Sequence, residues 1–214
     1  MFTVKSFTFS PIAENTYVLY NETGDCIIID PGCYFGNERR ELTDFISANG
    51  LRPKYLLNTH CHLDHVFGNK FIYETWQLEP YIHPNEQLVL ENAPIAALHW
   101  GMPFDNYKGP LHFLRENELI RLGNDALKVL FAPGHSPGHI CFYCQQQDFL
   151  IGGDVLFKMS VGRTDLPGGD TDTLMNSIRA ELFVLPDQTV VYPGHGEPTT
   201  IGFEKANNPY LKNT

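Results

Sequence analysis

The stretch THCHLDH at residues 59–65 decides the class of fold and site, because four side chains that can bind a metal lie within six residues: His60, His62, Asp64 and His65. The whole chain of 214 residues holds nine histidines, so three of them in one short loop argue against a chance polar loop. Imidazole nitrogen and carboxylate oxygen suit zinc, iron or manganese, and a site without thiolate ligands keeps positions open for water.

The residues before this stretch indicate how it presents its ligands. Residues 55–57 are apolar and predict a short strand that leads into the loop. Side chains two apart on an extended chain point to the same side, so we expect His60 and His62 to project together and Cys61 to point away. The other two metal-capable residues follow where the chain must turn. One loop can therefore offer two pairs of ligands to two adjacent ions.

Length, composition and charge bound the class of protein. With 214 residues, 43% of them hydrophobic, the chain can bury a full core, and we expect a single domain over residues 1–214. Fifteen Lys and Arg stand against twenty-five Asp and Glu, which gives a formal charge of -10 without a basic cluster. A nucleic-acid partner is therefore not expected.

The cellular compartment follows from what the chain lacks. Residues 1–20 have neither the basic region nor the unbroken apolar stretch of an export signal, and no later segment is apolar enough to span a bilayer. We therefore expect a soluble cytoplasmic protein with no membrane partner. The five cysteines are interpreted as reduced core thiols, including the CxxC pair Cys141 and Cys144, which lies in a strand-like run. The oligomeric state is not indicated.

Hydrophobic periodicity predicts alternating strands and helices in two halves. In the first half we expect strands at 4–9, 16–20, 26–30, 55–57 and 81–83 and helices at 37–49 and 66–76. Residues 84–117 are the least regular stretch. In the second half we expect strands at 119–122, 127–132, 139–145, 149–152 and 189–192 and a helix at 173–184. This order suggests two packed sheets with helices outside them.

Further metal-capable side chains follow glycine- or proline-containing turns at the ends of predicted strands: Asp30, His135, Asp154 and His195. Glycine allows a sharp bend beside a ligand, and a strand end holds a side chain firmly while letting it reach outward. Each residue alone could be an ordinary turn residue. Together they can supply the ligands that the 59–65 loop lacks.

The chain resembles the metallo-β-lactamase superfamily in its HxHxDH motif and in a later His, a later Asp and a final His, which stand here as His60, His62, Asp64, His65, His135, Asp154 and His195. The resemblance implies an α/β fold, an αββα four-layer sandwich of two mixed sheets flanked by helices. It also implies two divalent metal ions, expected as Zn²⁺ with Fe or Mn as options. His60, His62 and His135 would hold one ion.

The resemblance places the second ion between Asp64, His65 and His195, with Asp154 bridging both. The carboxylates Asp64 and Asp154 are taken as catalytic. Asp30 would orient a ligand histidine by a hydrogen bond.

Two further segments, FAPGHSPGH at 131–139 and GRTDLPGGD at 162–170, are similar to the glyoxalase II group, the hydroxyacylglutathione hydrolases, and particularly to its short bacterial members. This implies a hydrolase that cleaves small-molecule S-acyl thioesters such as S-lactoylglutathione by a metal-bridging hydroxide. Arg163 lies near a cationic substrate-binding position of that group. The helical domain that carries glutathione contacts in longer members is not expected, so other small acyl thioesters stay open.

Other functions within the resemblance stay open as well. Persulfide dioxygenases are similar to this chain and use one iron, with ligands equivalent to His60, His135 and Asp154. A lactone or phosphodiester hydrolase and a di-iron binding module are further alternatives. The penicillin-degrading branch usually has Cys or Ser where Asp154 stands and is usually exported, and neither feature fits this chain.

The remaining histidines have no ligand spacing. His139 begins a predicted strand, so packing or a hydrogen bond near the site is the favoured interpretation. His83, His99 and His112 are interpreted as structural or surface residues. An aromatic-rich set in residues 100–107 either packs under a long connection or walls the metal cleft.

Overall fold

The computed structural model describes residues 1–211, which form two compact units. The first unit comprises Met1–Leu114 and Leu122–Asp125, and the second comprises Arg115–Arg121 and the chain from Ala126 onward. Within residues 1–211, every helix is too short or too polar to cross a bilayer. The expectation of a single domain stays a prediction, since each unit is compact by itself.

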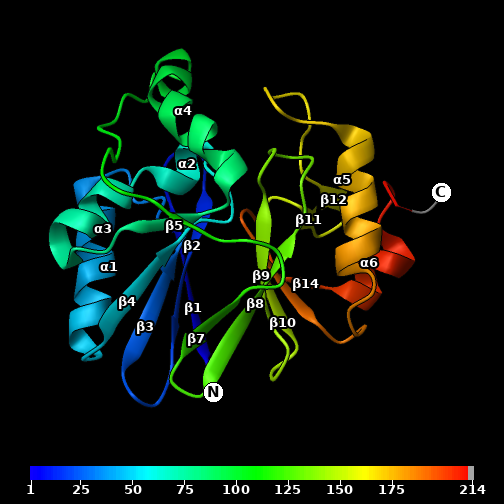
Figure 1. The fold of residues 1–214 in the computed structure, drawn as a ribbon, viewed down its shortest axis with the longest axis horizontal. Helices are drawn as coiled ribbons and strands as arrows, with labels where there is room; N and C mark the ends of the chain where they lie inside the picture. The colour runs from blue at the N-terminus through cyan, green and yellow to red at the C-terminus, as the bar shows by residue number, and fades with distance from the viewer. Residues whose placement is uncertain (212–214) are drawn as a thin grey trace. The chain divides into compact units, whose positions relative to one another are not determined.

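The first unit is built on a six-stranded mixed sheet in the order β1-β2-β3-β4-β5-β6 (Figure 1). Its strands are β1 (Thr3–Phe9), β2 (Glu14–Tyr20), β3 (Asp25–Ile29), β4 (Arg52–Leu57), β5 (Pro80–Ile82) and β6 (His112–Phe113). The first three strands pair antiparallel as a meander, and β3 to β6 pair parallel. Parallel pairing brings the carboxyl ends of β3 and β4 to one edge, where Asp30 and the 59–65 loop begin.

Two helices cover one face of this sheet: α1 (Gly36–Ala48) and α3 (Asn69–Trp76). Their apolar stripes bury Leu42, Ile46 and Ile72 against strand residues such as Val18, Ile28 and Leu56. Gly50, with a φ of +61°, follows α1 as the predicted C-terminal glycine. The helix expected at 66–76 begins only at Asn69, because the backbone turns at Gly68, whose N–H donates to the carbonyl oxygen of Pro31.

We expected residues 84–117 to be the least regular stretch of the chain, but part of this stretch is a regular helix. These residues contain η1 (Pro84–Glu86) and the 13-residue helix α4 (Gln87–His99), which buries Leu90, Ala93 and Ala97. Pro94 lies inside this helix. Because proline normally ends a helical pattern, the sequence did not predict the helix. Met102 and Phe104 after α4 pack on the same apolar cluster, so this part of the aromatic set serves packing.

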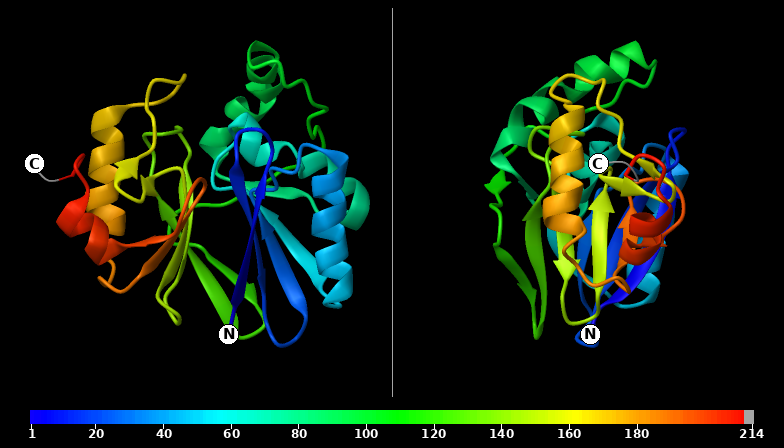
Figure 2. Two further views of the ribbon diagram at one scale, coloured as in Figure 1. Left: turned by 180° about the vertical axis from the view of Figure 1, so that it is seen from behind. Right: turned by 90° about the vertical axis from the view of Figure 1, so that its right-hand side faces the viewer.

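The second unit holds another six-stranded mixed sheet, in the order β14-β13-β10-β9-β8-β7 (Figure 2). Its strands are β7 (Leu119–Leu122), β8 (Asp125–Phe131), β9 (Ile140–Cys144), β10 (Phe149–Gly153), β13 (Val190–Pro193) and β14 (Thr199–Thr200). Only β10 and β13 pair parallel among the registered pairs. A separate hairpin joins β11 (Leu156–Phe157) to β12 (Ser160–Val161).

Helices α5 (Thr171–Ser177) and α6 (Ile201–Asn207) cover one face of the second sheet (Figure 2). Asp170 caps α5 by accepting from the N–H of Thr173. The helix continues as one π-helical turn, η2 (Ile178–Leu182). Sequence reasoning did not foresee α6, β14 or the β11–β12 hairpin, because these elements are short. The α/β prediction of two mixed sheets flanked by helices is confirmed.

Candidate metal centre

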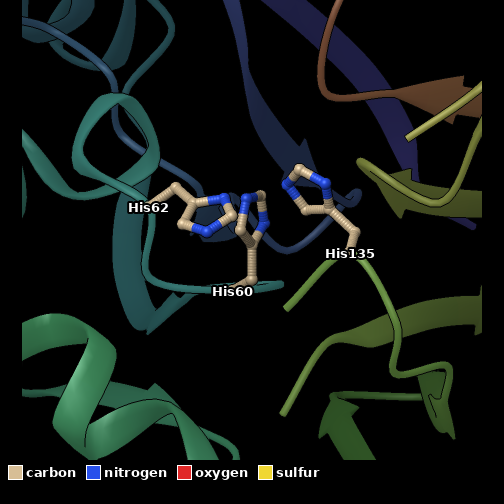
Figure 3. A group of neighbouring side chains, drawn as sticks. All are labelled: His60, His62 and His135. Carbon is tan, nitrogen blue, oxygen red and sulfur yellow. The ribbon is translucent and has the colours of Figure 1, made fainter. Parts of the chain in front are cut away.

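The first unit gathers one group of predicted ligands, here called the first ligand cluster: His60, His62, Asp64 and His65. The chain leaves β4 at Leu57, and His62 has extended backbone angles as the N-cap of the short helix α2 (Leu63–Val66). Helix α2 carries the other two residues. The ring centroid of His60 lies 4.7 Å from that of His62 (Figure 3). It lies 4.1 Å from that of His65. Asp64 Oδ2 lies 3.8 Å from His65 Nε2.

The cysteine in the same stretch packs among apolar side chains. The side chain of Cys61 lies in an apolar cluster with Leu63, Phe67 and Leu90, on the opposite side from the histidines as alternation predicts. Burial raises the pKa of the Cys61 thiol well above its usual range, so the thiol stays protonated. The loop therefore offers imidazole and carboxylate groups, and no thiolate competes with them.

Asp30 fixes the orientation of this cluster. Its Oδ1 accepts from the backbone N–H of Thr59 at 2.7 Å, and its Oδ2 accepts from Thr59 Oγ1 at 2.6 Å. The ring of His65 contributes Nδ1 at 3.1 Å from the same Oδ2. A carboxylate can only accept, so Nδ1 carries the proton and Nε2 is the nitrogen available to a ligand. Thr59 is a contributor that sequence reasoning missed.

We expect Asp30→Ala to weaken binding of the ion held by His65 by about 10- to 100-fold, because the imidazole loses its orienting acceptor. Isothermal titration of metal-free protein with Zn²⁺ measures this. Asp44→Ala, at an exposed position of α1, is the matched control and should bind Zn²⁺ as wild type does. Unchanged Zn²⁺ binding by the Asp30 variant would refute the orienting role.

Glu14 lies behind Asp30 as a fully buried acid. Its Oε2 accepts from Thr16 Oγ1 at 2.9 Å, and Thr16 Oγ1 accepts from the N–H of Gly32 at 2.9 Å. A Cβ on Gly32 would overlap Glu14 Oε2, so only glycine fits here. Burial is the main cause that raises the pKa of Glu14 well above 4.5, and the charges of Asp30 and Asp64 add to it.

This shift predicts a pH-dependent difference between wild type and Glu14→Gln. A carboxyl with a raised folded-state pKa contributes stability below its unfolded pKa, near 4.5, and loses it as pH rises through the folded pKa. The free energy of unfolding of wild type minus that of the variant should therefore fall as the pH rises above 4.5. Urea unfolding of metal-free protein between pH 4.5 and 8 tests this, and parallel pH profiles would contradict it.

The second unit gathers the second ligand cluster: His135, Asp154 and His195. His135 follows the end of β8, Asp154 follows the end of β10, and His195 follows the end of β13. All three strands belong to the same sheet. Asp154 Oδ2 lies 3.6 Å from His135 Nε2 and 3.6 Å from His195 Nε2. One carboxylate oxygen thus faces a ring nitrogen on each side. His135, labelled in Figure 3, is nearly buried, whereas the His195 side chain is 27% exposed.

Backbone groups orient this cluster. His135 Nδ1 lies 2.7 Å from the carbonyl oxygen of Arg163, which can only accept, so the proton is on Nδ1 and Nε2 faces Asp154. The N–H of Asp154 donates to His139 Nε2 at 3.0 Å. His139 therefore makes a hydrogen bond near the site, which confirms its interpretation from the sequence. The N–H of Gly194 donates to Gly153 and ties the His195 loop to β10.

Arg163, the predicted substrate contact, forms a bidentate ion pair with Asp165. Its Nε and Nη2 each lie 2.7 Å from a carboxylate oxygen of Asp165. This hydrogen bonding lowers the pKa of Asp165 to about 2, so Asp165 is anionic near neutral pH. A substrate carboxylate at Arg163 would compete with this partner.

The seven predicted ligands thus fall into two clusters, four in the first unit and three in the second. Joining of the clusters into one centre stays a prediction. The other histidines have structural partners: His99 Nδ1 contacts the carbonyl of Ile95, and His112 pairs with Glu79. Sequence reasoning missed Glu86, a buried acid that accepts from the N–H of Cys61 at 2.8 Å and holds the histidine loop.

The fold and the ligand clusters define a class of protein. Residues 10–195 match the family model of the metallo-beta-lactamase superfamily, and the chain belongs to this superfamily. The chain is 36% identical over 202 residues to the probable metallo-hydrolase YqgX of Bacillus subtilis, covering 94% of this chain and 93% of that protein. It is 36% identical over 200 residues to the hydroxyacylglutathione hydrolase GloC of Haemophilus influenzae, covering 92% of each.

Solved structures agree with this class. The B3 metallo-beta-lactamase BLEG-1 superposes with a TM-score of 0.91 at 36% identity, covering 99% of this chain and 100% of that chain. TTHA1623, solved in a di-iron-bound form, superposes with a TM-score of 0.87 at 39% identity, covering 97% of this chain and 100% of that chain. The chain is therefore similar both to a protein described as a β-lactamase and to one that binds two irons.

Proposed function

We propose that this protein is a metal-dependent hydrolase of S-acyl thioesters, of the hydroxyacylglutathione hydrolase type. The observation that carries the proposal is the placement of Asp154 Oδ2 at 3.6 Å from Nε2 of both His135 and His195. A carboxylate oxygen flanked by the Nε2 atoms of two imidazoles is the arrangement expected of a ligand that bridges two ions. The similarity to GloC of Haemophilus influenzae supports the thioester substrate.

In this proposal the two ligand clusters together hold two ions. One ion would be held by His60, His62 and His135, and the other by Asp64, His65 and His195, with Asp154 shared. The donor atoms are nitrogen and oxygen, which suits zinc, iron or manganese. The di-iron form of TTHA1623 supports a two-ion centre.

The chemistry divides between the ions and the protein. Two bound cations supply Lewis acidity and a water acidic enough to act as a nucleophile near neutral pH. The protein orients two of the ligand imidazoles, through Asp30 at His65 and through the Arg163 carbonyl at His135. Asp64 and Asp154 supply negative charge that lowers the cost of holding the cations. A thioester suits this site because its thiolate leaving group needs little protonation.

Recognition of the substrate through Arg163 is part of the proposal. The guanidinium lies in the segment whose carbonyl orients His135, so it is tied to the centre by the backbone. Because Asp165 already neutralises it, an anionic substrate would bind there only by displacing Asp165. We therefore propose that small S-acyl thioesters in general are substrates, and that a glutathione carboxylate adds modest affinity.

β-Lactam hydrolysis is the second candidate, and the observation that favours it is the 36% identity to BLEG-1 over nearly the whole chain. The two activities use the same attack on an acyl carbon. They differ in the leaving group, which is a thiolate in one case and a ring amide nitrogen in the other. The substrate pocket decides between them, so direct comparison of rates is needed.

The test is metal analysis of purified protein beside assays with S-lactoylglutathione, a penicillin and glutathione persulfide. We expect about two ions per chain and thioester cleavage with kcat/KM of at least about 10⁴ M⁻¹s⁻¹. A chelator should abolish the activity, and two equivalents of Zn²⁺ should restore it. Faster penicillin cleavage would establish the second candidate. One iron per chain with oxygen uptake would establish the persulfide dioxygenase alternative and overturn the hydrolase.

A further inference from the structure

Glu204 on α6 is a fully buried acid outside the seven predicted ligands. Its Oε1 accepts from Thr199 Oγ1 at 2.5 Å. Its Oε2 accepts from the N–H of Met159 at 3.0 Å and from Asn208 Nδ2 at 2.8 Å. Burying a carboxyl group is costly unless hydrogen bonds satisfy it. Three donors meet this need: Thr199 in β14, Met159 in the β11–β12 hairpin, and Asn208, the C-cap residue of α6 itself. Glu204 therefore links α6 to β14 and to the hairpin.

Two of these segments flank the loop that carries His195. Thr199 opens β14 directly after that loop, and Met159 lies at the turn of the β11–β12 hairpin with a φ of +63°. A non-glycine residue in this backbone conformation needs support from its surroundings. The hydrogen bond from its N–H to Glu204 supplies such support. Glu204 therefore joins the hairpin to the strand on the far side of the His195 loop.

The hairpin in turn contacts the His195 loop directly. The ring of Phe157 packs edge-to-face on the His195 imidazole, with centroids 6.3 Å apart and an interplanar angle of 74°. Lys158 Nζ forms an ion pair with Glu197 at 2.7 Å. His195 needs this lateral support more than His135 does, because its side chain is 27% exposed against 3%.

We propose that Glu204 is a positioning residue for His195. It fixes the β11–β12 hairpin and the start of β14, so that the imidazole is held between Phe157 on one side and a restrained loop on the other. Asn208 strengthens the link, since its side chain also donates to the carbonyl of Ser160 at 3.0 Å. The inference rests on the proposed two-ion centre, in which His195 is a ligand of one ion.

Two variants separate positioning from general stability. Glu204→Ala removes all three acceptor contacts. Glu204→Gln keeps the shape: its amide oxygen can accept from Met159 and Asn208, and its NH₂ can donate to the hydroxyl of Thr199, which is both donor and acceptor. We therefore expect Gln to rescue what Ala loses. Lys205→Ala is the matched control, because it breaks the ion pair of α6 with Asp187 without touching the hairpin.

The experiment is calorimetric titration of metal-free protein with Zn²⁺, resolved into two binding steps. Relative to wild type, Glu204→Ala should weaken one step about tenfold and change the other by less than twofold, and Glu204→Gln and Lys205→Ala should change neither by more than twofold. If Glu204→Ala does not fold, Thr199→Val, which removes only the Oε1 contact, should weaken the same step about threefold.

A double-mutant cycle with His195→Ala completes the test. If Glu204 acts through His195, Glu204→Ala should have no further effect on Zn²⁺ binding in the His195→Ala background. An equal loss in both steps, or the same loss without His195, would overturn the positioning role. If wild type binds two ions and Glu204→Ala binds both with unchanged affinity, this inference alone is overturned. Wild type that binds fewer than two ions overturns the proposed centre and the inference with it.

Discussion

Replacement of Asp154 by alanine is expected to lower kcat/KM for S-lactoylglutathione by at least about 1,000-fold and to leave no more than one ion per chain. The reason is geometric. Asp154 Oδ2 faces Nε2 of both His135 and His195 at 3.6 Å, so one side chain contributes to both ligand sets. Without it, five imidazoles and the single carboxylate of Asp64 would have to hold two dications. Metal analysis beside steady-state kinetics measures both effects.

Two controls define the cause of this loss. Asp154→Asn preserves the volume of the side chain but supplies a neutral amide, so it should lose nearly as much activity as alanine. Asp187→Asn changes an exposed aspartate that pairs with Lys205, and it should retain wild-type activity and metal content. An Asp154→Ala protein that keeps two ions and more than a tenth of its activity would exclude a bridging role.

Gly162→Ala is expected to have the second-largest effect. A Cβ at this position would overlap the carbonyl oxygen of Asp154 and would lie 3.1 Å from the carbonyl carbon and 3.2 Å from His135 Nδ1. Backbone cannot move aside as a flexible side chain can, so two of the three residues of the second ligand cluster must shift. We expect a destabilisation of about 1–3 kcal/mol from overpacking. Activity should fall about 100-fold, because shifts of 1 Å cost that much.

The measurement is urea unfolding together with kinetics. Gly36→Ala is the matched control, since a Cβ there meets only the flexible end of Arg40 at 3.8 Å. It should be neutral in both assays. If Gly162→Ala keeps full activity and stability, the close packing of the 162–165 segment on the second ligand cluster is not needed for function.

The sequence predicted well those features whose signal is local. The apolar run at residues 55–57 predicted strand β4, and the spacing of two predicted that His60 and His62 project together. The turn residues near the N-terminus predicted the meander. For His139 the sequence predicted packing or a hydrogen bond near the site, and its Nε2 accepts from the N–H of Asp154. These inferences need only the period of the chain and the chemistry of each residue type.

Features that depend on distant partners could not be predicted in this way. Helix α4 was missed because Pro94 interrupts its pattern and because the helix exposes Leu88, Ile95 and Leu98. The burial of Glu86 and Glu204 has no local signature, since each acid accepts hydrogen bonds from other segments. Short elements such as β14 and α6 lie below the length at which periodicity is informative. Thr200, which caps α6, was the available signal.

The central claim is that the two ligand clusters meet around a pair of ions. X-ray absorption spectroscopy of protein loaded with two equivalents of Zn²⁺ tests it most directly, because a second metal in the same centre scatters as a distinct shell. We expect a metal–metal distance of about 3.5–4 Å, with nitrogen and oxygen neighbours and no sulfur. The shell should disappear in Asp154→Ala. Two bound ions without a metal–metal shell in wild type would contradict the account.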